Sequence, residues 1–300
     1  MVGILPLSYY NNIGRKIIVK HKNYLDRIVG SRIIVIMKLT LTTTEFTPAR
    51  DVKIPDIYYH RLKTGITELD EFFGGADNKC GGLLRGGVYI LAAGAGTGKS
   101  TFCLQLAEAF CNRKIRVAYA SGEESIEQLA FTCKRLNVRH VPIAVQTDVD
   151  NLIKKMEHLD FIIIDSFQTL SVKKHMTPRK KELYCIRELC AAAKRTSCTV
   201  IALCHLTKAG VYKGSTAVLH AVDACINLRV DEEDSSMRVF SWSKNRFGPA
   251  DKEMNVLIDQ SGYNWAEEPS TEPLHTTEVL AKKFNFVGQE TDSKNLENNS

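Results

Sequence analysis

The stretch VYILAAGAGTGKSTFCLQLAEAFCN (Val88–Asn112) joins an apolar run, a glycine-rich turn and a helical pattern. Val88–Ala93 has the length and composition of a buried strand, and apolar residues recur at helical spacing through Lys99–Asn112. The turn between them, AGAGTGKS (Ala93–Ser100), fits the pattern G-x-x-x-x-G-K-[ST] except at Ala93, where a small residue replaces the first glycine. A chance glycine turn would need neither a strand before it nor a helix after it. The stretch therefore predicts a phosphate-binding loop.

This loop has the chemistry to hold the phosphates of a nucleotide. Its glycines let backbone N–H groups wrap the phosphates, and the helix N-terminus adds its positive end. Lys99 is expected to reach the β- and γ-phosphates, and the Ser100 hydroxyl is expected to ligate Mg²⁺. The residues predicted to contact the nucleotide are Gly94, Ala95, Gly96, Thr97, Gly98, Lys99, Ser100 and Thr101. The expected cofactors are therefore ATP and Mg²⁺.

A second apolar run, DFIIID (Asp160–Asp165), ends in a carboxylate that suits the same chemistry. Asp165 is the predicted metal ligand that accompanies Ser100, with a helix N-cap as the alternative interpretation. Asp160, at the other end of the run, is interpreted as a solvated strand start.

A third run, Ile115–Ala120, is followed by Glu123 and Glu124. Ligands of open α/β sheets bind at the carboxyl edge of the strands, so a carboxylate there would point into the nucleotide crevice. Glu123 is the first candidate for the base that orients the attacking water, and Glu124 is the second. Glu124 is also expected to cap the following helix.

Strands alternate with helices through the middle of the chain. The expected strands are Val88–Ala93, Ile115–Ala120, Phe161–Asp165 and Thr199–Leu203, and the expected helices are Thr67–Phe73, Lys99–Asn112, Ile126–Leu136 and Lys181–Arg195. Three later strand-like runs, Ala224–Arg229, Arg238–Ser243 and Met254–Ile258, are separated by turns. We therefore expect an α/β fold with a mostly parallel twisted sheet, helices on both faces and an antiparallel extension at one edge.

The net charge of +6 is concentrated at the start of the chain. Residues 1–36 hold six lysines and arginines against one aspartate, so the rest is almost neutral. We favour Met37 as the functional start, although an acid-poor, basic segment also fits an organelle transit peptide. Residues 37–61 are interpreted as an extended lead-in, 62–265 as the globular domain and 266–300 as a polar disordered tail with a docking segment around Val279–Val287.

The spacing of the cysteines and the length of the apolar runs argue against a zinc-binding protein and against a membrane-spanning protein. None of the nine cysteines forms a C-x-x-C pair, so no zinc site is expected, and a reducing, cytoplasmic compartment fits best. The apolar runs are far shorter than the roughly 20 residues that span a bilayer. We therefore expect no contact with a membrane.

Four stretches carry a resemblance to a known family. They are TGITELDEFFGG (Thr64–Gly75), the phosphate-binding loop, SGEES (Ser121–Ser125) and KNRFG (Lys244–Gly248), supported by IIIDSFQTL and HLTKAG. Over residues 62–265 the chain resembles the RecA-like ATPases, and among them the bacterial RadA/Sms branch-migration family. The resemblance implies a Mg²⁺-dependent, DNA-dependent ATPase of recombination and repair, a helicase or branch-migration motor that moves along single-stranded DNA as a homo-oligomeric, hexameric ring in a bacterial or phage-infected cell.

The resemblance also implies roles for single residues. Lys244 and Arg246 would reach across a subunit interface to the neighbour's γ-phosphate, although a solvated basic turn is the plainer interpretation. His205 would sense the γ-phosphate or be structural. Two loops, Ser171–Lys181 and the one after His205, would face the ring's channel and bind DNA. Their basic residues are Lys173, Lys174, Arg179, Lys180, Lys181, Lys208 and Lys213.

The chain also departs from the family. We expect neither the family's four-cysteine zinc module, since no cysteines are paired, nor its protease-like C-terminal domain, since a polar tail follows the core; Gly214-Ser215 stands where the family has glycine-proline. Two alternative functions share the core: a DnaB-like replicative helicase, for which no helical collar is visible, and a KaiC-like ATPase that acts as a protein-interaction or signalling module. A RecA-like strand-exchange recombinase is disfavoured because KNRFG is typical of the ring motors.

Overall fold

The computed structural model describes residues 47–74, 81–207, 212 and 214–265. The chain divides into two units, Met1–Lys53 and Ile54–Ser300. In the first, the described residues form a 3-10 helix, η1 (Ala49–Asp51). The predictions for residues 1–36, for residues 266–300 with the docking segment, and for Lys208 and Lys213 lie outside the described residues.

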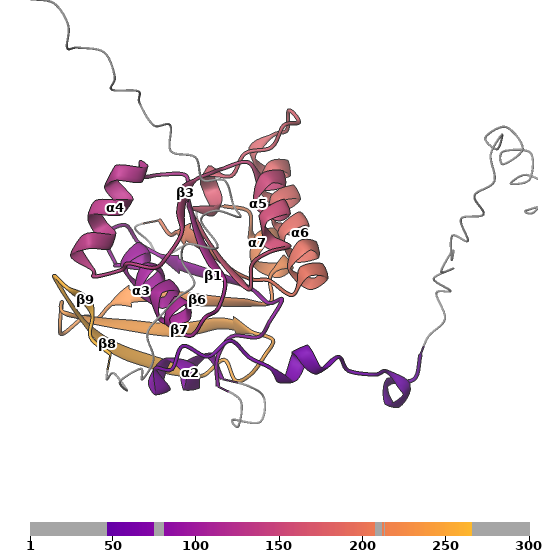
Figure 1. Cartoon of the computed structure of the whole chain (residues 1–300), viewed down its shortest axis with the longest axis horizontal. Coiled ribbons are helices and arrows are strands. Elements are labelled where there is room, and N and C mark those ends of the chain that lie inside the picture. Colours follow the sequence, from indigo (N-terminus) through magenta and orange to yellow (C-terminus); the bar gives the residue numbers. More distant parts are fainter. Residues whose placement is uncertain (1–46, 75–80, 208–211, 213, 266–300) are drawn as a thin grey trace, which may run out of the picture. The chain divides into compact units, whose positions relative to one another are not determined.

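The second unit is built on a sheet of nine strands (Figure 1). In spatial order the strands are β3 (Ile143–Val145), β2 (Val117–Ser121), β4 (Phe161–Asp165), β5 (Thr199–His205), β1 (Val88–Ala93), β6 (Ala224–Val230), β7 (Met237–Asn245), β8 (Glu253–Asp259) and β9 (Gly262–Tyr263). The pairs from β3 to β6 are parallel, and the pairs from β6 to β9 are antiparallel. The predicted mostly parallel sheet with an antiparallel extension is confirmed.

Helices cover both faces of the sheet because each central strand is apolar on both sides. In β1, Tyr89 and Leu91 join one hydrophobic core, while Val88 and Ile90 join the other. The first core also takes side chains from α2 (Thr67–Phe73), α3 (Lys99–Asn112) and α4 (Ile126–Arg135). The second takes them from α5 (Val149–Met156), α6 (Pro178–Thr196) and α7 (Thr216–Ala221), which Figure 1 shows grouped together. None of the helices in the described part of the chain is long and apolar enough to cross a bilayer.

The strands β1 and β4 and the helices α2 and α3 have the predicted bounds, but other elements differ. The helix expected from Lys181 begins at Pro178, since proline fits a first turn where no N–H donor is needed. Four short strands and α-helices were not predicted: β3, α5, α7 and β9. Each has eight residues or fewer, too short for hydrophobic periodicity to stand out.

The interpretation of Asp160 as a solvated strand start is wrong. Its side chain is 18% exposed and pairs with Arg85 Nη1 at 2.9 Å and Arg116 Nε at 2.8 Å. The two arginines precede β1 and β2, so the aspartate ties together the starts of three parallel strands. Burial opposes its ionisation, but the hydrogen bonds from Arg116 and Arg85 outweigh burial and hold the pKa of Asp160 below its ordinary value.

Asp160→Asn is expected to lower the free energy of unfolding at pH 7 by about 2 kcal/mol, because both arginines lose a charged acceptor. A carboxylate with a depressed pKa stabilises the fold above its unfolded-state pKa and ceases to do so as the pH falls through the folded-state pKa. The difference between variant and wild type should therefore shrink below about pH 4. Urea unfolding over a pH series measures it, with exposed Asp251→Asn as the control. A pH-independent difference would contradict the ion-pair explanation.

Candidate functional site

The glycine-rich turn leaves the carboxyl end of β1 and enters α3 at its N-terminus. Gly96 and Gly98 have φ values of +73° and +98°, the left-handed region that glycine adopts at little cost. A Cβ on Gly98 would also lie 2.8 Å from the Tyr263 hydroxyl. The two glycines thus let the loop curl tightly over the start of the helix, which supports the sequence interpretation as a phosphate-binding loop.

Lys99 folds back over this loop. Its Nζ donates to the backbone oxygen of Gly94 at 2.7 Å and, at 3.3 Å, to that of Ala93. The side chain belongs to a residue that is only 6% exposed, and burial lowers the pKa of its ammonium group. A cation held by two carbonyl oxygens at the end of a strand is available to a phosphate that enters the loop.

Ser100 and Asp165 meet as predicted. The Ser100 hydroxyl donates to Asp165 Oδ2 at 2.7 Å, and the Tyr119 hydroxyl donates to the same oxygen at 2.5 Å. A hydroxyl and a buried carboxylate side by side are the hard oxygen donors that Mg²⁺ prefers. Within the described ranges, no group of three His, Cys, Asp or Glu could hold a metal. These two residues therefore fit a Mg²⁺ that takes its remaining oxygens from phosphate and water.

Glu123 lies just after the carboxyl end of β2, beside two residues at the carboxyl ends of β4 and β5. Its Oε1 accepts a hydrogen bond from the Ser166 hydroxyl and lies 2.9 Å from His205 Nε2. Partial burial opposes ionisation, but the hydrogen bonds from Ser166 and His205 outweigh it and lower the pKa of Glu123. The sequence analysis predicted that Glu123 and His205 lie at the ends of strands, but it did not predict Ser166 as a site residue. The sequence signal for Ser166 was its position directly after Asp165.

Glu124 does not cap the next helix, contrary to expectation. Ser125 is the N-cap of α4, and it forms a capping box with Gln128. Burial, followed by the charges of Asp165 and Glu123, raises the pKa of Glu124. The sequence signal for the true cap was the serine three residues before Gln128.

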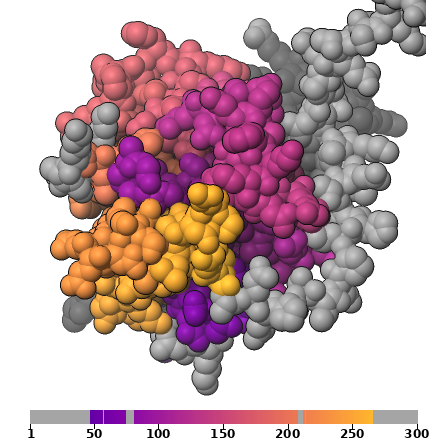
Figure 2. All heavy atoms as spheres, turned by 90° about the vertical axis from the view of Figure 1, so that its left-hand side faces the viewer, coloured from indigo at the N-terminus to yellow at the C-terminus, as the bar shows by residue number. Residues whose placement is uncertain are grey.

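Residues of the C-terminal strands β7 and β9 contact the glycine-rich loop. Arg238 Nε donates to the Thr97 carbonyl at 2.9 Å, and the Tyr263 hydroxyl lies 3.4 Å from the Gly98 oxygen. Figure 2 shows this face. The yellow atoms of the last described strands lie between the orange atoms, which belong to residues earlier in the chain, and the magenta atoms of α4. Sequence reasoning missed both residues, because only the fold brings positions so distant in the chain to the loop.

Lys244 and Arg246 reach the end of α7. Lys244 Nζ donates to three backbone carbonyls there, and Arg246 Nη1 pairs with Asp223 Oδ1 at 3.4 Å. The two cations therefore share one side, as expected of residues two apart. Their reach toward a neighbouring subunit stays a prediction.

The basic residues predicted for DNA contact divide between two environments. Lys173 and Lys174 are exposed in the segment after β4, whereas Arg179, Lys180 and Lys181 lie in the first turn of α6, so the loop expected to run to Lys181 ends earlier. The Ser215 N–H donates to Glu182 Oε2 at 2.9 Å, which joins α6 to the end of the second predicted loop. The described ends of the two loops therefore lie side by side.

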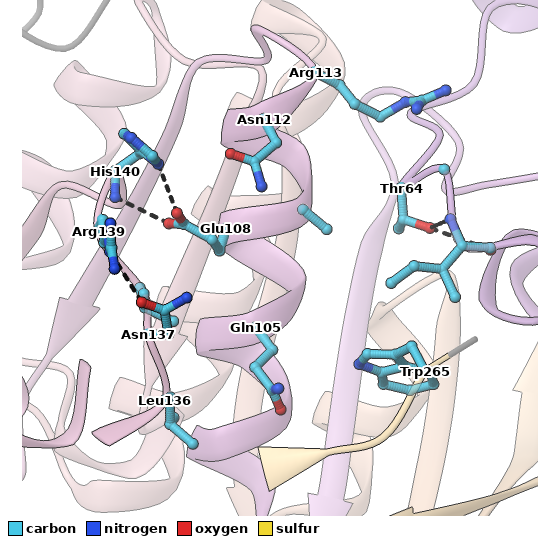
Figure 3. A pocket seen from close by; sticks show the side chains of 14 residues that line it. Thr64, Gln105, Glu108, Asn112, Arg113, Leu136, Asn137, Arg139, His140 and Trp265 are labelled. Carbon is cyan, nitrogen blue, oxygen red and sulfur yellow. Dashed lines mark hydrogen bonds and ion pairs between the residues drawn. The ribbon is translucent and has the colours of Figure 1, made fainter. Parts of the chain in front are cut away.

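A cavity of about 570 Å³ lies away from the carboxyl edge of the sheet, where Lys99, Asp165 and Glu123 gather (Figure 3). Gln105, Glu108 and Asn112 project into it from one face of α3, and His140 meets Glu108 at 2.6 Å between Nδ1 and Oε1. No residue predicted for nucleotide, metal or DNA contact lines it.

Comparisons with known proteins agree with this geometry. A family model described as "AAA domain" matches residues 77–211. The chain is 32% identical over 231 residues to DNA repair protein RadA of Mycobacterium tuberculosis, covering 73% of this chain and 47% of the relative, and 32% identical over 225 residues to that of Brucella abortus, covering 70% and 46%. The chain thus spans about half the length of the curated relatives it matches.

Two solved structures share the fold. One of them, described as an ATPase domain, superposes with a TM-score of 0.56 at 17% identity, over 69% of this chain and 92% of that one. The flagellar accessory protein FlaH from Methanocaldococcus jannaschii gives 0.53 at 15% identity, over 69% and 99%.

Proposed function

We propose that this chain, which contains a RecA-like P-loop ATPase domain resembling that of DNA repair protein RadA, hydrolyses ATP with Mg²⁺ and couples the hydrolysis to movement along single-stranded DNA in recombination or repair. One observation carries the proposal. Lys99, the Ser100–Asp165 pair and the Glu123–His205 pair gather at the carboxyl edge of the adjacent strands β1, β2, β4 and β5.

Each group has a part in phosphoryl transfer to water. The loop amides and Lys99 bind and orient the phosphates, and Ser100 with Asp165, which lie in hydrogen-bond contact, would hold the metal. The bound Mg²⁺ would supply charge neutralisation on the phosphate oxygens. Glu123, whose carboxylate form is favoured by the hydrogen bonds from Ser166 and His205, accepts a hydrogen bond from the attacking water and aligns it. His205, which is in contact with Glu123, is the candidate for the residue that senses the terminal phosphate.

The proposed assembly is a hexameric ring in which one subunit completes the site of the next. Arg246 is the candidate for the cation that acts in trans, because its side chain is 52% exposed and its contact with Asp223 is long. A guanidinium has the planar donors that stabilise the charge of a phosphoryl group in transfer.

The proposed DNA contacts are the basic residues after β4 and in the first turn of α6, together with Lys208 and Lys213. The described residues among them are exposed or half-buried and follow Asp165, the last residue of β4, in the chain. Each phosphate that these residues neutralise releases counterions, so DNA binding should weaken as salt is added.

Replacing Lys173, Lys174, Arg179 and Lys180 together with glutamine is expected to raise the single-stranded DNA concentration that half-maximally stimulates ATP hydrolysis by about tenfold or more. The salt dependence of that concentration should become shallower, since fewer counterions are released. Steady-state ATP hydrolysis by the full chain, with and without single-stranded DNA over a salt series, measures both quantities.

The matched control replaces Lys63, Lys134, Arg187 and Lys194, four exposed cations elsewhere, with glutamine. Equal effects of the two sets would show that only net charge matters and would remove the loop contacts from the proposal. Hydrolysis by the wild type that is indifferent to DNA would overturn the motor and favour a protein-regulated switch.

A further inference from the structure

Tyr119 extends from the middle of β2 toward the carboxylate of Asp165. It pairs with Ile163 of β4, two residues before Asp165, so the two side chains lie on the same face of the sheet. The tyrosine is fully buried in the first hydrophobic core. A buried phenol hydroxyl needs a hydrogen-bond partner, and this one donates to Asp165 Oδ2 at 2.5 Å. Tyr119 therefore connects the core to the residues that fit Mg²⁺.

Asp165 Oδ2 accepts hydrogen bonds from two directions. One donor is Tyr119 on β2, and the other is the Ser100 hydroxyl in the first turn of α3, at 2.7 Å. Two donors from different elements on one oxygen fix the rotation of the carboxylate about its Cβ–Cγ bond. Among the residues that the structure describes, none donates a hydrogen bond to Oδ1. That oxygen is therefore available to a metal ion or to a water bound to it.

The same carboxylate orients the hydroxyl of Ser100. A serine hydroxyl has one hydrogen and two lone pairs, so donation to Asp165 leaves its oxygen free to ligate a metal ion. The phenol of Tyr119 has a different part, because its one donor is used by Asp165 and its ring lies inside the core. Replacing a side chain that holds a metal ligand in place typically lowers metal affinity by about 10–100-fold.

We propose that Tyr119 is a positioning residue for the metal: its hydroxyl holds the Asp165 carboxylate, and through it the Ser100 hydroxyl, in the orientation that binds Mg²⁺ together with a nucleotide. This role rests on the proposed function in one respect, since it assumes that Mg²⁺ and a nucleotide bind at this edge of the sheet. It requires neither DNA nor a ring.

Tyr119→Phe tests this role, because it keeps the ring in the core and removes only the hydroxyl. The dissociation constant of a fluorescent, non-hydrolysable ATP analogue is measured on the full chain, once with EDTA and once with Mg²⁺. The ratio of the two constants is the gain in nucleotide affinity that the metal provides. In Tyr119→Phe this gain is expected to fall about tenfold, while the constant in EDTA stays within about twofold of the wild-type value.

Tyr89→Phe is the matched control. Tyr89 is also buried, and its hydroxyl accepts a hydrogen bond from the Leu84 N–H at 2.9 Å, at the end of β1 far from the glycine-rich loop. The variant is expected to keep the gain from Mg²⁺ within about twofold. Both variants are measured well below their Tm. An equal fall in the two variants would show that loss of any buried hydroxyl weakens the metal site, and would overturn the role of Tyr119.

A double-mutant cycle tests whether Tyr119 acts through Asp165. Asp165→Asn is expected to lose most of the gain from Mg²⁺, and adding Tyr119→Phe to it should change the remainder by no more than about twofold. A further tenfold fall in the double variant would show that the tyrosine acts by another route, and would contradict the positioning role.

The wild type separates the two possible failures. If Mg²⁺ tightens nucleotide binding in the wild type and Tyr119→Phe keeps the whole gain, the positioning role fails and the proposed metal site stands. If Mg²⁺ gives the wild type no gain, the proposed metal site fails, and the role of Tyr119 fails with it.

Discussion

Glu123→Gln is expected to lower the turnover number for ATP hydrolysis by about 10³-fold while ATP still binds. The glutamine keeps the shape of the side chain but loses the negative charge that draws a proton from water. In the wild type, the hydrogen bonds from Ser166 and His205 keep this carboxylate ionised despite partial burial. Steady-state hydrolysis gives the turnover number, and a fluorescent ATP analogue gives the affinity.

The neighbouring carboxylate provides a matched control. Glu124→Gln makes the same chemical change one residue along the chain, at a side chain whose pKa burial raises. It is expected to change turnover by no more than about threefold. A large loss in Glu124→Gln together with normal turnover in Glu123→Gln would transfer the role of base to Glu124.

The nucleotide edge could be predicted from the sequence because its parts follow local rules. Val88–Ala93, the glycine turn and Lys99–Asn112 are contiguous, and each has a clear pattern. Parallel strands end at one edge, so Asp165 and Glu123 could be brought together without knowledge of the strand order. The register confirms the reasoning, since Ser121 and Asp165 are paired across β2 and β4.

The residues that were missed depend on contacts between distant parts of the chain. Tyr119 reaches Asp165 only because β2 and β4 are neighbours, and Arg238 reaches the glycine turn from a strand about 140 residues later. The helix α7 has few residues and no side-chain N-cap hydrogen bond, so neither a periodic pattern nor a capping residue indicates it in the sequence. The contacts of Lys244 with the carbonyl oxygens at the end of α7 could not be inferred without that helix.

Lys99→Met is expected to lower kcat/KM for ATP by at least about 10³-fold, because it removes the charge that meets the β- and γ-phosphates. Methionine keeps a comparable length and apolar stem in a site that is almost fully buried. Burial already disfavours the ammonium form, as the lowered pKa of Lys99 indicates, so the variant should fold at least as well as the wild type.

The expected signature is therefore a loss of nucleotide response without a loss of fold. A ligand that binds only the native state raises Tm, so Mg²⁺ with ATP should stabilise the wild type and leave Lys99→Met unchanged. Exposed Lys194→Met, the control, should keep both the shift and the turnover. Retention of more than about a tenth of the wild-type kcat/KM in Lys99→Met would contradict the assignment of the glycine turn as the phosphate site. A lowered Tm without ATP would instead show that the contacts of Lys99 with Gly94 and Ala93 hold the empty loop together.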